Sequence, residues 1–293
     1  MSRAAIALFS ALVAAAPVVI PVAHAAESLE IVWHPARLGL GGVGWVHVKS
    51  VPDTAMVEGS VAVRPLRFFP YAGGHAAVVG IDVETRPGTH PWRVAVVEPG
   101  RAPRTAAGRF AIERRQFPVE RLTLPRAMVD LDPATERRAA VEREALVTLY
   151  RTITPERLWR GGFTRPVASA EPPAGFGARR ILNGQPRAPH TAVDYTAPAG
   201  TLVVAANSGR VAMVAEFFFL GRLVVLDHGR GLYTLYSHLE STALGVGDRV
   251  DRGQTIGAVG ATGRATGPHL HWGAQLGAAR IDPLALLLLP LSD

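Results

Sequence analysis

Short apolar or alternating stretches, separated by turns rich in Pro and Gly, fill the first part of the chain. Short strands with turn signals about every ten residues are typical of a β-sandwich. We therefore expect a β-rich accessory domain over residues 26–112, smaller than the part that follows. The predicted strands are residues 28–33, 45–51, 61–63, 76–81 and 92–97.

A helical pattern interrupts the strands between residues 113 and 165. Asp132 and Pro133 form an N-cap followed by proline at the first helical position. From residue 134 to 151, Val141, Ala145 and Leu149 recur on one face, and most charged residues lie off it. This pattern predicts an amphipathic helix in a partly helical linker, with its charges on a solvated face.

From residue 166 to the end, the pattern is again that of strands and turns. The clearest predicted strands are residues 201–206, 210–216, 222–227 and 232–239. The apolar tail at 284–289 is too short to span a membrane, so we expect it to pack on the sheet. The chain is thus predicted to be mainly β, with an antiparallel sheet domain over residues 166–293.

The first 25 residues have the composition of a signal peptide. A short basic start precedes an apolar run at 4–22 and the small-x-small sequence Ala23-His24-Ala25. A membrane anchor is the alternative, but the run is short, rich in alanine and interrupted by Pro17 and Pro21. We expect export after cleavage, to the periplasm or cell envelope or into the medium, and no stable membrane span in the mature chain.

Composition excludes several classes of chemistry. Because the chain has no cysteine, disulfides, thiolate catalysis and a lipid-modified cysteine are excluded, and zinc would need His, Asp or Glu ligands. The formal charge is +7, and Lys49 is the only lysine, so arginine carries nearly all the positive charge. A basic surface favours anionic polymers, but the export signal and the lack of a basic stripe with interleaved aromatics argue against nucleic acid.

A His-x-His pair near the C-terminus is the first sign of a metal site. On a strand, His269 and His271 would point to the same side. The pair alone is a weak signal, because two histidines also meet by chance on surface strands. His190 and Asp194 share a face in a strand or a helix, and His238 ends a predicted strand.

These residues together could build a catalytic zinc site, which usually has three protein ligands and one open position. His190, Asp194 and either histidine of the pair would supply the ligands. The other histidine and His238 would remain to hold water, move its proton or stabilise an oxyanion. Among the remaining histidines after residue 25, we interpret His34, His47, His75 and His90 as surface or core residues and His228 as structural.

Several motifs occur in an order that resembles the M23 (lysostaphin/LytM-type) peptidoglycan endopeptidases, over about residues 166–290. The motifs are Phe176-Gly177-Ala178-Arg179-Arg180, Asn183-Gly184-Gln185-Pro186, His190-x-x-x-Asp194, Tyr236-x-His238-Leu239, Gly253-Gln254-x-Ile256-Gly257 and Thr262-Gly263-x-x-Thr266-Gly267-Pro268-His269-Leu270-His271.

The resemblance implies an antiparallel sheet with a groove walled by loops, one Zn²⁺ per chain, and cleavage of peptide cross-links in peptidoglycan. It implies that His190, Asp194 and His271 are the zinc ligands and that His238 and His269 are the catalytic histidines. One departure is Ala192, where the family usually has glycine, and this leaves the substrate preference open.

Four further residues are candidate substrate contacts. They are Arg179, Arg180, Asn183 and Tyr236. Arginines suit substrate carboxylates, but a structural ion pair is equally compatible with their positions. The alternative function is a non-enzymatic activator or wall-binding regulator of other cell-wall hydrolases, which the presence of all five site residues argues against. The sequence does not predict the bond cut, the oligomeric state or whether the N-terminal residues cover the groove.

Overall fold

The computed structural model describes residues 28–126, 129–168 and 173–290. The predicted signal peptide, residues 1–25, lies outside this part of the chain. None of the helices in the described part combines the length and hydropathy that a membrane span requires. The domain boundaries predicted after residues 112 and 165 stay predictions.

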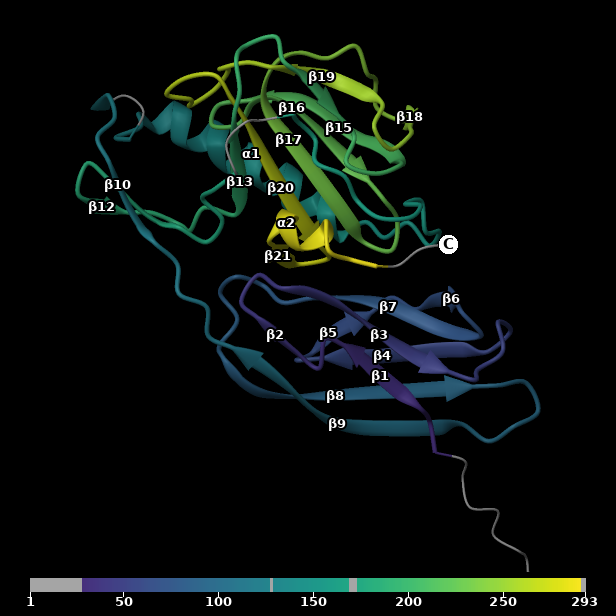
Figure 1. Cartoon of the computed structure of the whole chain (residues 1–293). Helices are drawn as coiled ribbons and strands as arrows, with labels where there is room; N and C mark the ends of the chain where they lie inside the picture. The colour runs from purple at the N-terminus through teal and green to yellow at the C-terminus, as the bar shows by residue number, and fades with distance from the viewer. Residues whose placement is uncertain (1–27, 127–128, 169–172, 291–293) are drawn as a thin grey trace, which may run out of the picture.

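Two stacked sheets form the N-terminal unit, as the sequence predicted (Figure 1). Their facing sides share a core that includes Val46, Val79, Val94 and Phe110. The first sheet has the order β1 (Ile31–His34), β3 (Val43–Lys49), β7 (Gly74–Gly80) and β6 (Phe69–Tyr71). The second has the order β2 (Arg37–Gly39), β9 (Arg104–Glu113), β8 (Gly88–Val97), β4 (Met56–Val61) and β5 (Arg64–Leu66).

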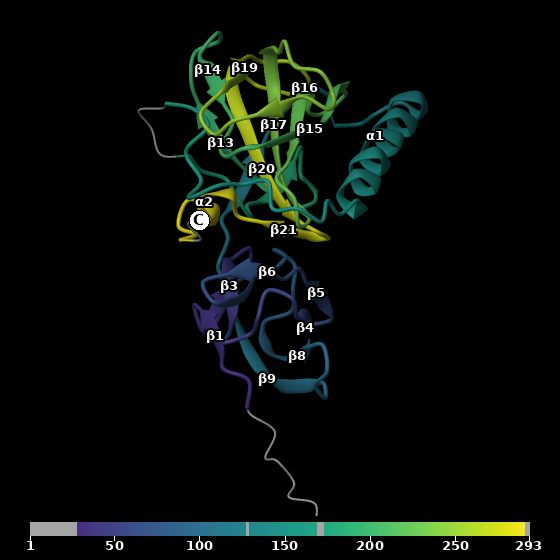
Figure 2. The ribbon, with the colours of Figure 1, turned by 90° about the vertical axis from the view of Figure 1, so that its right-hand side faces the viewer.

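The segment between the two β units contains the predicted helix, α1 (Pro133–Arg151). The Asp132 carboxylate caps it by accepting hydrogen bonds from the backbone N–H groups of Ala134 and Thr135, at 2.8 and 3.0 Å. Figure 2 shows the helix at the side of the C-terminal sheet. It packs there through Leu146, Leu149 and Tyr150, against a cluster that contains Leu223, Val225, Tyr233 and Leu235.

Val141 is 71% exposed, so its predicted place on the packed face of α1 is wrong. Only the C-terminal half of the helix packs its apolar side chains on the sheet, so Val141, which lies nearer the N-terminus, remains exposed. The segment also contains a strand that the sequence did not predict, β10 (Val119–Leu122). It pairs in parallel with β11 (Arg179–Leu182), which also pairs with β12 (Gln185–Pro186).

A large antiparallel sheet forms the C-terminal unit, and its main path confirms the mainly β prediction. The order along this path is β13 (Ala192–Thr196), β20 (His269–Leu276), β17 (Leu232–Ser241), β16 (Gly221–Asp227), β15 (Gly209–Phe217) and β18 (Arg249–Val250). Joined to it are β14 (Leu202–Val204), β19 (Thr255–Val259) and β21 (Ala279–Ile281), and the short helix α2 (Pro283–Leu286) follows. Leu286 and Leu289 of the predicted tail are buried in the core of this unit.

The two β units contact each other through an ion pair with a buried carboxylate and through a shared apolar cluster. Both carboxylate oxygens of Asp82 accept hydrogen bonds from the Arg280 guanidinium, at 2.9 and 2.7 Å. Phe69 and Val78 of the N-terminal unit belong to the same core cluster as Ile281. Burial raises the pKa of Asp82, but the hydrogen bonds from Arg280 outweigh it and hold the pKa below its ordinary value.

We predict that Asp82→Asn lowers the free energy of unfolding at pH 7 by about 1–3 kcal/mol, because Arg280 loses its buried carboxylate partner. Since the pKa of Asp82 is lowered in the folded state, its stabilisation is present above the unfolded-state pKa of about 4 and is lost at lower pH. Urea unfolding at several pH values measures both effects, and the variant should lose less stability than wild type on acidification.

Glu84→Gln is the matched control, because Glu84 also binds Arg280 but its side chain is 56% exposed. Removal of this exposed charge should change the unfolding free energy by no more than about 0.5 kcal/mol. Equal losses of unfolding free energy in the two variants would contradict the larger contribution assigned to the pair of Asp82 and Arg280.

Candidate metal centre

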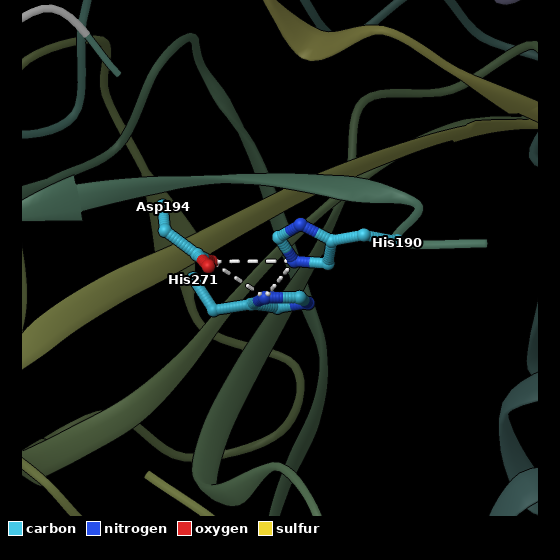
Figure 3. A group of neighbouring side chains, drawn as sticks. All are labelled: His190, Asp194 and His271. Atoms are coloured by element: carbon cyan, nitrogen blue, oxygen red, sulfur yellow. Dashed lines mark hydrogen bonds and ion pairs between the residues drawn. The ribbon is translucent and has the colours of Figure 1, made fainter. Parts of the chain in front are cut away.

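Three side chains from two neighbouring strands and one preceding loop converge on a single point (Figure 3). Asp194 on β13 lies directly opposite His271 on β20 in the antiparallel register. His190 comes from the loop just before β13, where backbone hydrogen bonds with Gly177 and Ala178 hold it. The Nδ1 atom of His271 is 2.9 Å from Asp194 Oδ1 and 3.0 Å from His190 Nε2, and the third distance is 3.3 Å.

The arrangement of these donor atoms fits a zinc ion. Donor atoms about 2.0–2.2 Å from a tetrahedral ion lie about 3.3–3.6 Å apart, slightly more than the observed distances. Two imidazole nitrogens and one carboxylate oxygen are also ligands that zinc commonly takes. Within the described residues, this is the group of His and acidic side chains whose donor atoms meet closely enough to hold a metal.

The protonation states of the three residues suit metal binding as well. Burial raises the pKa of Asp194, but hydrogen bonds from His190 and His271 outweigh it and hold the pKa far below its usual range. Burial, the largest cause, lowers the pKa of His271 to about 4. Near neutral pH, Asp194 is therefore ionised and His271 is neutral, which are the forms that bind metals.

His238 reaches this centre because the backbone leaves the regular strand at that residue. His238 has a φ of 61°, in the left-handed region that few non-glycine residues adopt. Its Nδ1–H donates to the carbonyl oxygen of Thr262, at 2.8 Å, so the neutral ring keeps Nε2 as an acceptor. Burial, the largest cause, and the nearby His271 together lower the pKa of His238 to about 3.

Two glycines allow the close chain approach that places Thr262 beside His238. A Cβ atom on Gly221 would lie 2.3 Å from the carbonyl carbon of Thr262, and one on Gly263 would lie 2.2 Å from the nitrogen of Gly221. Both glycines also have positive φ values. The Thr262 hydroxyl donates to the carbonyl of Leu239, which fixes the loop against the end of β17.

His269 is the fifth residue of the cluster. Its Nδ1–H donates to the carbonyl oxygen of Gly267, at 2.9 Å, so it has the same tautomer as His238. Its Nε2 is 4.0 Å from Asp194 Oδ1, and its ring centroid is 4.6 Å from that of His238. The structure therefore brings all five predicted residues together: three with converging donor atoms and two with backbone-anchored rings beside them.

Comparison with protein families identifies the unit that carries this site. Residues 188–283 match the family model described as peptidase family M23. Over this segment, the chain is similar to peptidase family M23. The matched segment includes all five residues of the cluster.

Relatives and a solved structure are similar to this chain over different extents. The peptidoglycan DD-endopeptidase ShyA of Vibrio cholerae is 44% identical over 100 residues, and the DD-carboxypeptidase/endopeptidase Mpg of Neisseria meningitidis is 39% identical over 99 residues. Each match covers 34% of this chain but only 23% of the relative. A crystal structure from Pseudomonas aeruginosa, described as a candidate peptidase M23, is 29% identical with a TM-score of 0.65. It covers 85% of this chain and 94% of its own, so the likeness extends beyond the M23 domain.

Arg180 lies next to the candidate metal centre, between two carboxylates. Its Nη2 donates to Asp194 Oδ2 at 3.3 Å, and its Nε donates to Glu120 at 3.1 Å. Arg179, its neighbour on β11, is exposed. The amide of Asn183 is engaged with the backbone of Leu124 through two hydrogen bonds of 2.9 Å. Of the three polar candidates, Arg180 is therefore the one that contacts the metal centre.

Sequence reasoning missed Glu120 and Thr262, which hold Arg180 and His238. Glu120 lies on β10, and its parallel partner strand begins about sixty positions later in the chain. No local sequence pattern predicts such a long-range pairing. Thr262 belongs to one of the motifs, but it binds His238 through its backbone oxygen, which any residue carries, so the motif did not reveal this contact.

Tyr236 is completely buried, on the core side of β17. Its hydroxyl accepts hydrogen bonds from the backbone N–H of Ala206 and from the Thr234 hydroxyl, at 2.9 and 3.0 Å. In a regular strand Tyr236 and His238 would share a face, but the left-handed conformation of His238 breaks the alternation. We therefore do not include Tyr236 among the proposed substrate contacts.

We predict that Tyr236→Phe lowers the free energy of unfolding by about 1–3 kcal/mol, because the buried Ala206 N–H loses its acceptor. Metal content and the KM for any substrate should stay unchanged. Thermal or urea unfolding measures the first effect. Tyr195→Phe is the matched control, because the Tyr195 hydroxyl is buried without a hydrogen-bond partner among the described residues. If the control lost as much stability as Tyr236→Phe, the hydrogen bonds would not be the cause.

Proposed function

We propose that this protein is a zinc-dependent endopeptidase that hydrolyses peptide cross-links of bacterial peptidoglycan in the cell envelope. The observation that carries the proposal is the convergence of His190, Asp194 and His271, with His238 and His269 beside them. The names of the relatives ShyA and Mpg support the same reaction class and the same substrate. The predicted signal peptide agrees with a site of action outside the cytoplasm, in the periplasm or elsewhere in the envelope.

In this proposal, His190, Asp194 and His271 hold one zinc ion through Nε2, Oδ1 and Nδ1. A bound zinc ion would act as a Lewis acid and would lower the pKa of a coordinated water toward about 7. Arg180 keeps the second oxygen of Asp194 occupied at 3.3 Å, so Oδ1 remains the oxygen that faces the two histidines.

The two remaining histidines move protons at defined atoms. Because each Nδ1–H is fixed on a backbone carbonyl, each neutral ring offers Nε2 to water or substrate. The low pKa of His238, about 3, keeps that ring neutral until it accepts a proton during the reaction. In the hydrolysis, an imidazole takes a proton from the water, whose oxygen bonds to the carbonyl carbon. The C–N bond then breaks as the imidazole passes that proton to the leaving amine.

We predict that His271→Ala and His238→Ala separate metal binding from proton transfer. His271→Ala should lose both zinc and wall hydrolysis, because only two ligands would remain. His238→Ala should keep stoichiometric zinc but lose about 10²–10⁴-fold in kcat, the range typical of a general acid–base residue. Inductively coupled plasma mass spectrometry of the purified proteins measures the zinc content. The release of soluble fragments from purified cell walls measures hydrolysis.

His90→Gln is the control for this pair, because His90 lies on β8 of the N-terminal sandwich, away from the cluster. It should keep both zinc and activity. Full hydrolysis by zinc-free His271→Ala protein would rule out the proposed mechanism. Loss of zinc from His238→Ala would instead make His238 a ligand.

A further inference from the structure

A cleft of about 880 Å³ extends from the metal centre across the outer face of the C-terminal sheet. His271 lines one end, and Ala192, Gly273 and Leu235 form the adjoining floor. Beyond them the walls come from α1 and from β5 in the N-terminal sandwich. The cleft is therefore built by three parts of the chain and is continuous with the proposed active site.

Two of the three floor residues next to His271, Ala192 and Gly273, are very small. Ala192 on β13 and Leu235 on β17 both lie opposite Gly273 of β20 in the sheet. A Cβ atom on Gly273 would approach its neighbours no closer than 3.7 Å, so the position is open above the sheet. Such a shallow, flat floor suits an extended peptide that lies across the strands with its cleaved bond at the metal centre.

The far walls of the cleft are strongly basic. The described residues that line it include six arginines but only one carboxylate, Asp82, which Arg280 already binds. Arg143 and Arg151 come from α1, Arg64 and Arg67 from β5 or next to it, and Arg230 and Arg280 from the C-terminal unit. The charge is not balanced within the cleft, which is therefore complementary to an anionic ligand.

Several of these guanidinium groups have N–H donors that form no hydrogen bond with the described residues. No hydrogen bond or ion pair joins Arg64, Arg67 or Arg143 to any described side chain. Arg230 donates through Nη1 to the carbonyl of Phe68 at 2.8 Å, but its Nε is buried without an acceptor among the described residues. A planar guanidinium with free N–H groups is well suited to a carboxylate, which it can bind through two parallel hydrogen bonds.

We propose that this cleft is a substrate subsite for acidic peptides, whose free carboxylates bind the arginines of α1 and β5. The inference rests on the proposed function for its direction, since it places the cleaved bond at His271. The proposal also gives the N-terminal sandwich a role. Its arginines line one wall of the cleft and bind the substrate, so the sandwich helps to determine which peptides are cleaved.

The test uses the full chain and two peptide probes. One is a soluble cross-linked stem-peptide dimer with free carboxylates, and the other is the same dimer with those carboxylates amidated. The variants are Arg143→Gln on α1 and Arg67→Gln beside β5. The controls are Arg137→Gln, which is on α1 but not in the cleft lining, and Arg114→Gln, an exposed arginine outside the lining.

For the free-carboxylate dimer, each cleft variant should raise KM about tenfold with kcat unchanged, because a charge-assisted contact is lost. For the amidated dimer, wild type and variants should have the same KM, and the two controls should match wild type on both probes. An unchanged KM in both cleft variants, or an equal loss on both probes, would overturn the proposal.

Anisotropy of a fluorescent stem peptide without a cross-link gives a second readout that needs no catalysis. Weaker binding to Arg143→Gln and Arg67→Gln than to wild type and the controls would support the subsite even if no bond were cut. Cleavage that is insensitive to both arginines would leave the proposed peptidase intact and would refute the subsite alone.

Discussion

The antiparallel register between β13 and β20 is the constraint on which the site depends. It sets Asp194 directly opposite His271, and the loop before β13 then brings His190 onto the same side. A slip of one residue would turn Asp194 or His271 to the other face of the sheet, because side chains alternate along a strand. Val193, Tyr195, Leu270 and Trp272 fix the register, since they alternate with the site residues and are buried on the opposite face.

The two histidines proposed to be catalytic depend on backbone outside the regular strands, through the conformation of His238 and the loop carbonyl that binds His269. His238 takes a left-handed conformation, and its ring hydrogen-bonds to the carbonyl oxygen of Thr262. The loop that contains Thr262 passes so close to Gly221 that a side chain at that position would clash with it. Such conformations persist only where the surrounding structure determines them. The sheet thus positions the proposed metal ligands, and the loops at its end position the groups that would move protons.

Much of this arrangement could be predicted from local sequence. The spacings of His269 with His271 and of His190 with Asp194 indicated shared faces, and the four C-terminal strands that were predicted lie close to β14, β15, β16 and β17. The long-range features could not be predicted, because they leave no periodic signal in the sequence. These features are the parallel pairing of β10, the shared core of the two β units and the face through which α1 packs on the sheet. The departure of His238 from the strand alternation, which separates its ring from the buried face of Tyr236, depends on packing around Thr262 and leaves no local pattern in the sequence.

The same fold that builds the metal centre also opens a basic cleft beside it, so one face of the sheet unites the proposed chemistry and the proposed substrate selection. The central claim is that this chain cuts peptide bonds in peptidoglycan with a metal ion held at His190, Asp194 and His271. Mass spectrometry of the muropeptides released from purified walls tests it most directly, with and without a zinc chelator. The account predicts that cross-linked dimers are converted to monomers whose combined mass exceeds that of the dimer by one water, and that the chelator stops this. Unchanged dimers, or cleavage that continues at full rate with the metal removed, would contradict it.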